Sequence, residues 1–570
     1  MYLQKNLQAL EFTNKPLQEK IAKLNEKDFI DIFPSQTPFV PSKDDLMMPN
    51  IFFCGIGDGL FLKKLINKHI FIFDKVEFFA NVLSKMDLSF ELSSGKIYLC
   101  DVEEKRLEEQ LCILFSQNEC FEYLGLFKLL SYSEFYDQSP MFDFAYKMCI
   151  DAIARVVGNV DVSFKMDSKI YKQFLLNLPA VFQNSPFARF IYENKTKNKS
   201  VIVVCAGPSL NKQLELLKKY QENFVIFAVD ATYKTLLKNN IYPDFVFTMD
   251  VHEEKWICFY ENLPKNEFKK PVLAFSACIN EKLRAKFDQE QNKFFILQNL
   301  DYQEKFHLND FGYLDIGLNV AHFAYNLAIA LKFKNVIIIG QDLAYGDDGK
   351  SHADYDVFNF TPVESIEHSI NKKKVLSYGK KTLIETNIAW DEFRKRLEVI
   401  FLSNPQINFY NATEGGAFID YTIEISFKEI LEKLKDYKKS YILPNPLSAN
   451  RQEKLLKKVL EQIQKEHNEL LLLHEKAQSL IQILEEKNHM QVEEDILHFN
   501  ELVDNSNILK TFMYKPLFYH RGLFNAKFYQ EPQNVNLHFK DFLKIFLEIC
   551  LISLENLDLA IKQYKNILKV

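Results

Sequence analysis

Polar side chains that could bind or activate a ligand stand at the ends of apolar runs in the middle of the chain. Seven such residues are Ser209, Asp230, Thr248, Asp250, Ser276, Gln341 and Asp342. Hydroxyls, carboxylates and amides bind the polar groups of a ligand, and a carboxylate can also accept a proton in a reaction. A single Asp after a strand is more often a helix cap, but this many polar groups at strand ends favour a binding site.

The turn after the run Val201–Val204 is the best-defined of these positions. The run predicts a buried strand, and Asn211–Tyr220 continues as a helix. The first amides of such a helix attract anions, so we expect Gly207, Pro208 and Ser209 to hold a nucleotide phosphate. The same residues could instead form an ordinary connection between strand and helix. Because the turn has one glycine and not three, NAD and FAD are disfavoured.

Strands and helices alternate with short connections from residue 201 to residue 411, which predicts a parallel sheet with crossover helices. The expected strands are 201–204, 224–230, 244–250, 271–276, 293–297, 335–343 and 407–411. Ligands of open α/β sheets lie at the carboxyl ends of the strands, where the seven polar residues stand. A loop at residues 345–352 and a candidate lid at residues 359–376 follow the strand 335–343.

A second α/β pattern lies nearer the N-terminus. The strand Ile51–Cys54 runs into a turn with glycines at positions 55, 57 and 59, and the strand Ile70–Asp74 ends in an acid that could hold a ribose hydroxyl. One interpretation is a pocket for a small nucleotide or S-adenosylmethionine. We favour a degenerate Rossmann-like domain whose glycines only turn the chain tightly, because short glycine motifs often match by chance.

Composition limits the class of protein. The 70 basic and 76 acidic residues give a net charge of −6, which provides no general attraction to nucleic acid or to an anionic membrane. The nine cysteines are scattered, which is typical of reduced thiols and not of a zinc site. Since no run is long and apolar enough for a secretory signal or a membrane span, we expect a cytoplasmic protein.

Three domains are expected: an N-terminal Rossmann-like α/β domain with a leading helix (1–195), a central Rossmann-like parallel-sheet domain (196–440) and a helical C-terminal domain (441–570). In the last, apolar residues from Leu456 to Leu484 recur at spacings of three, four and seven, and Phe539–Leu568 forms another amphipathic helix. This tail could be a packing or homo-oligomer element, or a docking surface for a protein partner.

Several motifs resemble those of the motility accessory factor (Maf) family of bacterial flagellin glycosyltransferases, in the same order. They are Val203–Leu210, Ala228–Thr232, Pro243–Asp250, Gly317–Ala324 and Ile339–Tyr345, followed by Ser351–Ala353 and Asn411–Ala417. The resemblance implies transfer of a nonulosonic acid, pseudaminic or legionaminic, from its CMP-linked form to Ser or Thr of flagellin in the cytoplasm. It also implies a central domain similar to bacterial sialyltransferases.

Two other functions stay open. Archaeal pterin pyrophosphokinases share the same domain family, so an ATP-dependent pyrophosphokinase acting on a hydroxymethyl heterocycle is one alternative. A non-catalytic flagellin chaperone is the other. Whether a divalent cation such as Mg²⁺ is needed is also open, because no Asp-x-Asp stands in the central strands and Asp347-Asp348 lies in a loop.

Glycosyl transfer needs a group that stabilises the departing phosphate and a base for the acceptor hydroxyl. His352 is the leading candidate for the base, because an imidazole has a pKa of about 6.5, close to working pH. It could also be an exposed loop histidine. Asp250 and Asp342 are rival bases, and each could equally hold a ribose hydroxyl or a magnesium ion.

The remaining candidates would bind the donor. We expect Asp230 and Thr232 to reach the ribose or base and Thr248 and Ser276 to line the pocket beside them, with Gln341 at the end of its strand. Gly317 and Asn319, at a helix start, suit the sugar carboxylate. Glu414 could close the site or merely form a turn. His322, on an apolar helix face, is predicted to be a packing residue.

Overall fold

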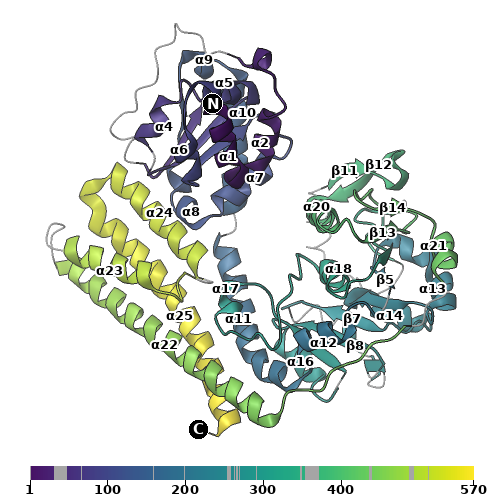
Figure 1. Cartoon of the computed structure of the whole chain (residues 1–570). Coiled ribbons are helices and arrows are strands. Elements are labelled where there is room, and N and C mark those ends of the chain that lie inside the picture. The colour runs from purple at the N-terminus through teal and green to yellow at the C-terminus, as the bar shows by residue number, and fades with distance from the viewer. Residues whose placement is uncertain are drawn as a thin grey trace. The chain divides into compact units, whose positions relative to one another are not determined.

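The computed structural model describes residues 2–30, 48–65, 67–157, 160–197, 199–252, 259–261, 263–264, 267–268, 270–290, 292–346, 349–353, 372–435, 439–486, 493–510 and 513–569. Contacts divide the chain into two compact units, residues 1–168 with 468–554 and residues 169–467 with 555–570 (Figure 1). Each unit contains its own parallel sheet flanked by helices, as predicted for an α/β protein with a helical C-terminal region.

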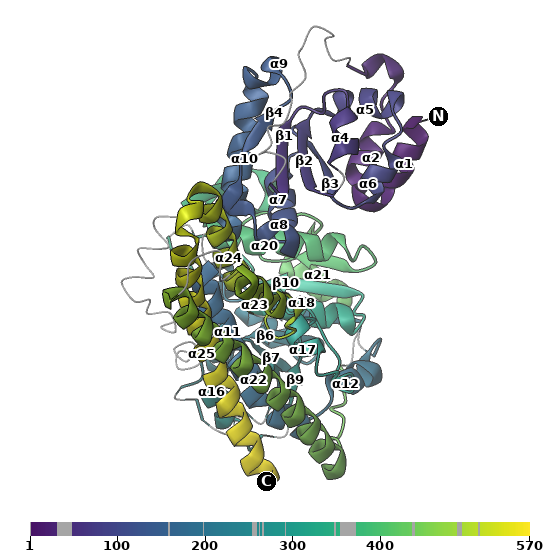
Figure 2. The same cartoon turned by 90° about the vertical axis from the view of Figure 1, so that its left-hand side faces the viewer.

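The first unit is built on four parallel strands in the order β3-β2-β1-β4. They are β1 (Asn50–Cys54), β2 (His69–Asp74), β3 (Ile97–Asp101) and β4 (Leu129–Ser131). Helices α1 (Tyr2–Thr13), α2 (Lys15–Ile21), α5 (Val76–Lys85) and α6 (Ser89–Ser93) cover one face, and α7 (Leu107–Phe115) and α10 (Pro140–Val157) cover the other (Figure 2). The strands are buried on both faces, which explains their continuous apolar runs.

The glycine turn after β1 is filled by side chains of the same unit. Gly55 and Gly57 have positive φ angles of 99° and 57°, which favour glycine. A Cβ atom at Gly55 would collide with the ring of Tyr136, and one at Gly57 with the ring of Tyr132. The glycines therefore make room for two buried rings, which supports the interpretation that they only turn the chain.

Asp74, the acid at the end of β2, is satisfied within the protein. Its carboxylate accepts hydrogen bonds from the amides of Ile56 and Lys75, both at 2.9 Å, and from the Tyr136 hydroxyl at 3.0 Å. Burial raises the pKa of Asp74 to about 6. Both carboxylate oxygens of Asp74 accept hydrogen bonds from within the protein, so Asp74 holds the turn together. The ribose hydroxyl that we considered as its partner is not needed to satisfy it.

The second unit contains an eight-stranded sheet in the order β14-β13-β10-β5-β6-β7-β8-β9, parallel throughout. Its strands are β5 (Ser200–Val204), β6 (Val225–Val229), β7 (Phe245–Thr248), β8 (Val272–Ser276), β9 (Lys293–Ile296), β10 (Asn335–Ile339), β13 (Asn408–Asn411) and β14 (Ile423–Glu424). All seven predicted strands are confirmed, and β14 is an eighth. The chain builds outward from β5 in one direction and returns to its other side with β10, so the strand order reverses between β5 and β10.

Crossover helices cover this sheet and set its strand-end loops (Figure 1). They include α12 (Phe187–Asn194), α13 (Leu214–Tyr220), α14 (Asp230–Lys238), α16 (Glu281–Lys286), α18 (Val320–Ala330), α20 (Ile388–Leu402) and α21 (Phe427–Leu434). The predicted helix 211–220 is in fact split into a short 3-10 helix η3 (Pro208–Lys212) and α13. An antiparallel hairpin, β11 (Lys372–Leu376) and β12 (Leu383–Asn387), leads into α20. Of the candidate lid 359–376, residues up to 371 lie outside the described residues.

Long helices account for the rest: α11 (Val160–Gln183), α22 (Ala449–Glu486), α23 (Glu493–Asn505), α24 (Tyr514–Gln530) and α25 (Val535–Leu568). Residues of α22 and of α25 belong to both units, whereas we predicted a separate helical domain from residue 441. The three-domain boundaries remain a prediction. A search of the helices within the described ranges finds none with the length and apolar character needed to span a bilayer.

Candidate active site

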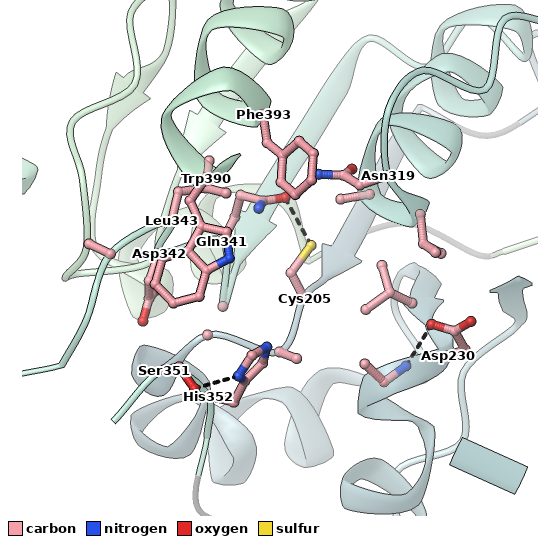
Figure 3. Close-up of a pocket in the computed structure, with 18 of the residues that line it drawn as sticks. Cys205, Asp230, Asn319, Gln341, Asp342, Leu343, Ser351, His352, Trp390 and Phe393 are labelled. Atoms are coloured by element: carbon pink, nitrogen blue, oxygen red, sulfur yellow. Dashed lines mark hydrogen bonds between the residues drawn. The ribbon is translucent and has the colours of Figure 1, made fainter. Parts of the chain in front are cut away.

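A cavity of about 250 Å³ opens at the carboxyl ends of the central strands of the second unit. Its lining residues are Cys205, Ala206, Gly207, Val229, Asp230, Ala231, Asp250, Phe259, Asn319, Val320, Ala321, Gly340, Gln341, Asp342, Leu343, Ala344, Ser351, His352, Trp390 and Phe393 (Figure 3). The cavity thus lies where the strand order reverses between β5 and β10, which is where open α/β sheets bind ligands.

Half of the residues predicted from sequence line this cavity. Those that do are Gly207, Asp230, Asp250, Asn319, Gln341, Asp342 and His352. Those that do not are Pro208, Ser209, Thr232, Thr248, Ser276, Gly317 and Glu414. The first group comes from six different loops and helix starts, so the fold brings together residues far apart in sequence.

The amides of the Gly207 turn do not face an empty anion site as predicted. The Gly207 amide donates to the carbonyl oxygen of Gly340 at 2.7 Å, and the Leu210 amide donates to that of Gly207 at 3.1 Å. The Ser209 amide donates to Asp342 Oδ2 at 2.6 Å, and its hydroxyl donates to Asp342 Oδ1. A carboxylate of the protein therefore occupies the position expected for a phosphate, and a phosphate would bind there only by displacing it.

Asp342 consequently caps the turn, and its role as a base stays a prediction. A Cβ atom on Gly207 would lie 2.6 Å from Asp342 Cγ and 2.6 Å from the Gly340 oxygen, so glycine is needed for this close approach. Burial raises the pKa of Asp342, and the hydrogen bonds from Ser209 act in the opposite direction. Each oxygen accepts one hydrogen bond from Ser209, so the carboxylate holds the turn in place.

Asp230 and Asp250 form an acidic side of the cavity. Asp230 is 3% exposed; its Oδ1 accepts from the Ala231 amide at 2.8 Å, while Oδ2 has no hydrogen-bond partner among the described residues. Burial raises the pKa of Asp230 to about 8, and the charge of Asp250 contributes to the shift. An unsatisfied buried carboxyl oxygen is costly, so this position is suited to a hydrogen bond with a ligand.

The neighbouring hydroxyl residues are used inside the protein. Thr232 donates to the main-chain oxygen three residues earlier, at 2.7 Å. Thr248 shares a short hydrogen bond with the Tyr260 hydroxyl, and Ser276 Oγ accepts from the amide two residues later at 3.1 Å. All three are buried behind the cavity wall, where they fix the strand ends.

Gln341 presents its side-chain amide from the end of β10. Its Oε1 accepts hydrogen bonds from the Cys205 thiol at 3.1 Å and from the Tyr325 hydroxyl at 3.3 Å (Figure 3). Burial raises the pKa of Cys205 to about 12, so the thiol stays protonated and able to donate. With Oε1 held in this way, the amide nitrogen is the group that remains to donate to a ligand.

Asn319 and Gly317 shape the start of α18. Asn319 Oδ1 accepts from the His322 amide at 2.9 Å, and a Cβ atom at Gly317, whose φ is 67°, would collide with the His322 side chain. His322 is 1% exposed, its Nδ1 accepts from the Leu318 amide and its Nε2 lies 2.9 Å from the Phe393 oxygen. Burial lowers the pKa of His322 to about 4. The predicted packing role of His322 is confirmed, and Gly317 serves this packing.

His352 lies beside Ser351 in the cavity wall, apart from Asp230 (Figure 3). Its Nδ1 is 2.9 Å from Ser351 Oγ, and the amide of Ala353 donates to the Ala206 oxygen at 2.9 Å, which ties this loop to the Gly207 turn. The ring meets Trp390 edge to face at 6.2 Å between centroids. His352 is therefore a held, half-buried residue of the cavity wall and not an exposed loop histidine.

The aromatic wall made by Trp390 and Phe393 was missed in the sequence. Both stand on the first turns of α20, whose cap is Asn387. Tyr345 packs against Trp390 with ring centroids 4.8 Å apart. The only available signal was that a predicted helix begins near residue 386, which does not reveal the face it turns toward the cavity.

Glu414 forms a turn. It is exposed, has a φ of 53° and accepts a hydrogen bond from the Phe427 amide at 3.4 Å. Of the two roles considered, this geometry matches the turn.

A metal site is not apparent in the described part of the chain, where no three His, Cys, Asp or Glu side chains are grouped to hold an ion. Asp347 and Asp348 lie outside the described residues. The two carboxylates on the acidic side, Asp230 and Asp250, are the lining acids that could contribute to such a site, and the need for a cation stays open.

Part of the chain matches the model of a known protein family. Residues 172–348 match the family described as "6-hydroxymethylpterin diphosphokinase MptE-like". The matched segment contains the large sheet up to β10 and most of the cavity. No curated protein matches the sequence.

A solved structure then extends the similarity to the whole chain. It is the Maf glycosyltransferase from Magnetospirillum magneticum AMB-1, with a TM-score of 0.54, 15% sequence identity, and coverage of 100% of this chain and 97% of that chain. The chain therefore has the fold of that Maf protein from end to end. The resemblance drawn from the sequence motifs is confirmed at the level of the fold.

Proposed function

We propose that this chain is a glycosyltransferase that moves a nonulosonic acid, pseudaminic or legionaminic, from its CMP-activated form to Ser or Thr hydroxyls of flagellin in the cytoplasm. One observation carries the proposal. In a chain with the fold of a Maf glycosyltransferase, six of the seven motifs that resemble the Maf family contribute lining residues to one cavity at the switch point of the sheet.

The acidic side of the cavity suits the nucleoside. The Asp230 Oδ2 atom is buried and unsatisfied, so a ribose hydroxyl or a base amino group would supply the missing hydrogen bond. Trp390 and Phe393 offer flat apolar surface against which a ring of the donor can pack. The cavity thus combines a few placed polar groups with an aromatic wall, as expected for a site that binds a nucleotide sugar.

The start of α18 suits the negative charge of the donor. Val320 and Ala321 line the cavity at the first turn of this 11-residue helix, where main-chain amides and the helix dipole favour an anion. The Gln341 amide nitrogen adds a neutral donor. Asn319 Oδ1 already accepts from the His322 amide, so the main chain at Val320 and Ala321 and the Gln341 amide nitrogen are the groups proposed to hold the carboxylate or phosphate.

His352 is the proposed base. In the transfer, the acceptor oxygen forms a bond to the anomeric carbon, its proton passes to an imidazole nitrogen, and the bond between that carbon and the phosphate oxygen breaks with its electron pair going to the phosphate, which leaves as CMP. The Ser351 hydroxyl lies 2.9 Å from Nδ1 and orients the ring in the cavity wall, and a proton taken up by the imidazole gives the stable imidazolium form. Asp250 is the rival base.

Ligand binding tests the proposal directly. In thermal-shift measurements with CMP, CDP, ATP and NAD, we expect CMP and CDP to raise the melting temperature without added metal, and NAD to have no effect. His352→Ala should keep CMP binding and lower transfer by about 10²–10⁴-fold. Stabilisation by ATP with Mg²⁺, and none by CMP, would contradict a CMP-sugar transferase.

The family match over residues 172–348 favours one second candidate, a pyrophosphokinase that moves diphosphate from ATP to a hydroxymethyl heterocycle. That reaction brings together a triphosphate and a cation, and the carboxylates of Asp230 and Asp250, which line the cavity, are the groups that would hold the cation. Release of AMP from ATP in the presence of 6-hydroxymethylpterin and Mg²⁺ would identify this activity.

A further inference from the structure

The hairpin β11–β12 has one face anchored beside the cavity. Its strands pair antiparallel, with Leu376 opposite Leu383 and Lys374 opposite Glu385. On the inner face, Val375 packs in a small core with Ala344. Side chains alternate across a strand, so the residues on either side of Val375 point away from this core.

The outward face carries exposed apolar side chains. Leu376 is 47% exposed and its cross-strand neighbour Leu383 is 62% exposed. Leucines directly opposite each other on adjacent strands lie side by side, so the pair forms one continuous apolar surface. Because the inner face is packed, the hairpin displays this surface on a fixed support.

The same hairpin is strongly basic. Residues 372–387 contain five lysines (372, 373, 374, 380 and 381) and one acid, Glu385, a net charge of +4 in a protein whose net charge is −6. Lys372 pairs with Glu385 at 2.9 Å and Lys373 with Asp391 at 2.5 Å. Lys374 and Lys381 are exposed and have no acidic partner within ion-pair distance among the described residues.

Hydrogen bonds connect the hairpin to the cavity wall. The Tyr345 amide donates to the main-chain oxygen of Glu385 at 2.9 Å. The Thr386 hydroxyl donates to the main-chain oxygen of Leu343, a lining residue, at 2.7 Å. Asn387 at the end of β12 caps α20, on which Trp390 lines the cavity. The hairpin is therefore attached to the wall of the proposed active site, beside its opening.

We propose that the outward face of β11–β12 is the docking surface for the acceptor polypeptide, and that it holds a segment with apolar and acidic side chains close to the hydroxyl that is glycosylated. This inference rests on the proposed function, since it assigns the acceptor side of that reaction. The hairpin lysines do not line the cavity, so their charge is available to a partner outside it. An apolar pair flanked by unpaired cations complements a polypeptide of mixed apolar and acidic character.

Two double variants of the full chain test the surface. Lys374→Glu with Lys381→Glu reverses the unpaired charges, and Leu376→Thr with Leu383→Thr removes the apolar pair while keeping β propensity. The control is Lys433→Glu with Lys435→Glu, which makes the same charge change at exposed positions at the end of α21. All three proteins are compared with wild type for flagellin transfer, direct flagellin binding and CMP release from the donor without acceptor.

We expect each hairpin variant to raise the KM for flagellin about tenfold with donor hydrolysis unchanged, and the control to match wild type. Added salt should raise the wild-type KM and have little effect on the charge-reversed variant. Unchanged flagellin KM and binding in both hairpin variants would overturn the docking surface. A change of oligomeric state in sedimentation, or loss of binding to vesicles with anionic lipid, with flagellin KM unchanged, would also overturn it. If wild type itself transfers nothing to flagellin, the proposed function fails instead.

Discussion

Asp230→Asn is expected to make the empty protein more stable at pH 8 while it weakens donor binding. In the folded state the pKa of Asp230 is raised from 3.8 to about 8 by burial and by Asp250. The folded state therefore binds more protons than the unfolded state between these values, so stability is lost as pH rises from about 4 to about 8. At pH 8 the loss amounts to about 5 kcal/mol, since one pKa unit corresponds to about 1.36 kcal/mol.

The asparagine side chain of Asp230→Asn cannot ionise, so the variant does not lose stability as pH rises. Its Oδ1 can still accept the hydrogen bond from the Ala231 main-chain amide. Its NH₂ group takes the place of the unsatisfied Oδ2, which costs about 2 kcal/mol, so the net gain at pH 8 is about 3 kcal/mol. For a unit of this size that is a rise in melting temperature of about 5 °C. At pH 5 the loss of stability from ionising Asp230 is only about 2 kcal/mol, which the cost of the unsatisfied NH₂ group offsets, so no gain is expected there.

Thermal melts of wild type, Asp230→Asn and the exposed control Asp420→Asn at pH 5 and pH 8 measure these differences. The control should change the melting temperature by about 1 °C or less at either pH. CMP titration at pH 7.5 should show affinity for Asp230→Asn reduced about tenfold or more. The reasoning is refuted if the variant is destabilised at pH 8, or if its difference from wild type is the same at both pH values.

Three further substitutions have specific outcomes. Gly207→Ala should destabilise the second unit by about 1–3 kcal/mol in urea unfolding, because its Cβ would press against the fixed Gly340 oxygen; a neutral effect would contradict the close approach. Asp342→Asn should cost about 1–3 kcal/mol by weakening the cap on Ser209, and equal stability would show that the cap is not needed. Trp390→Ala should weaken CMP-sugar binding about tenfold, measured by calorimetry, and unchanged affinity would remove the ring from the donor site.

The central sheet could be predicted because a strand that is buried on both faces has a continuous run of apolar residues in the sequence. Residues 335–339, Asn-Val-Ile-Ile-Ile, show this most clearly. The short strands β4 (Leu129–Ser131) and β14 (Ile423–Glu424) were missed, since two or three residues carry no periodic signal. In the tail, α23 and α24 were also missed, and the aromatic residues of α24 do not form a regular stripe.

Residues of the site were predicted from their positions at strand ends. Whether each one lines the cavity depends on the direction in which its side chain points. Asp230 and Gln341 face the cavity, but Thr248 and Ser276 turn into the protein, a difference that local sequence does not encode. The bond between Ser209 and Asp342 spans 133 residues and arises only when β5 and β10 become neighbours. The sequence motif therefore identifies the turn but not the carboxylate that occupies it.

The most direct test is the intact mass of flagellin after incubation with this protein and a CMP-nonulosonic acid. We predict that flagellin gains whole nonulosonic acid residues, one per modified hydroxyl, and that CMP is released in equal amount. Asp250→Asn or His352→Ala should slow the gain by about 10²–10⁴-fold while the protein remains folded. Flagellin of unchanged mass with both pseudaminic and legionaminic donors, from wild-type protein shown to bind CMP, would contradict the proposed function.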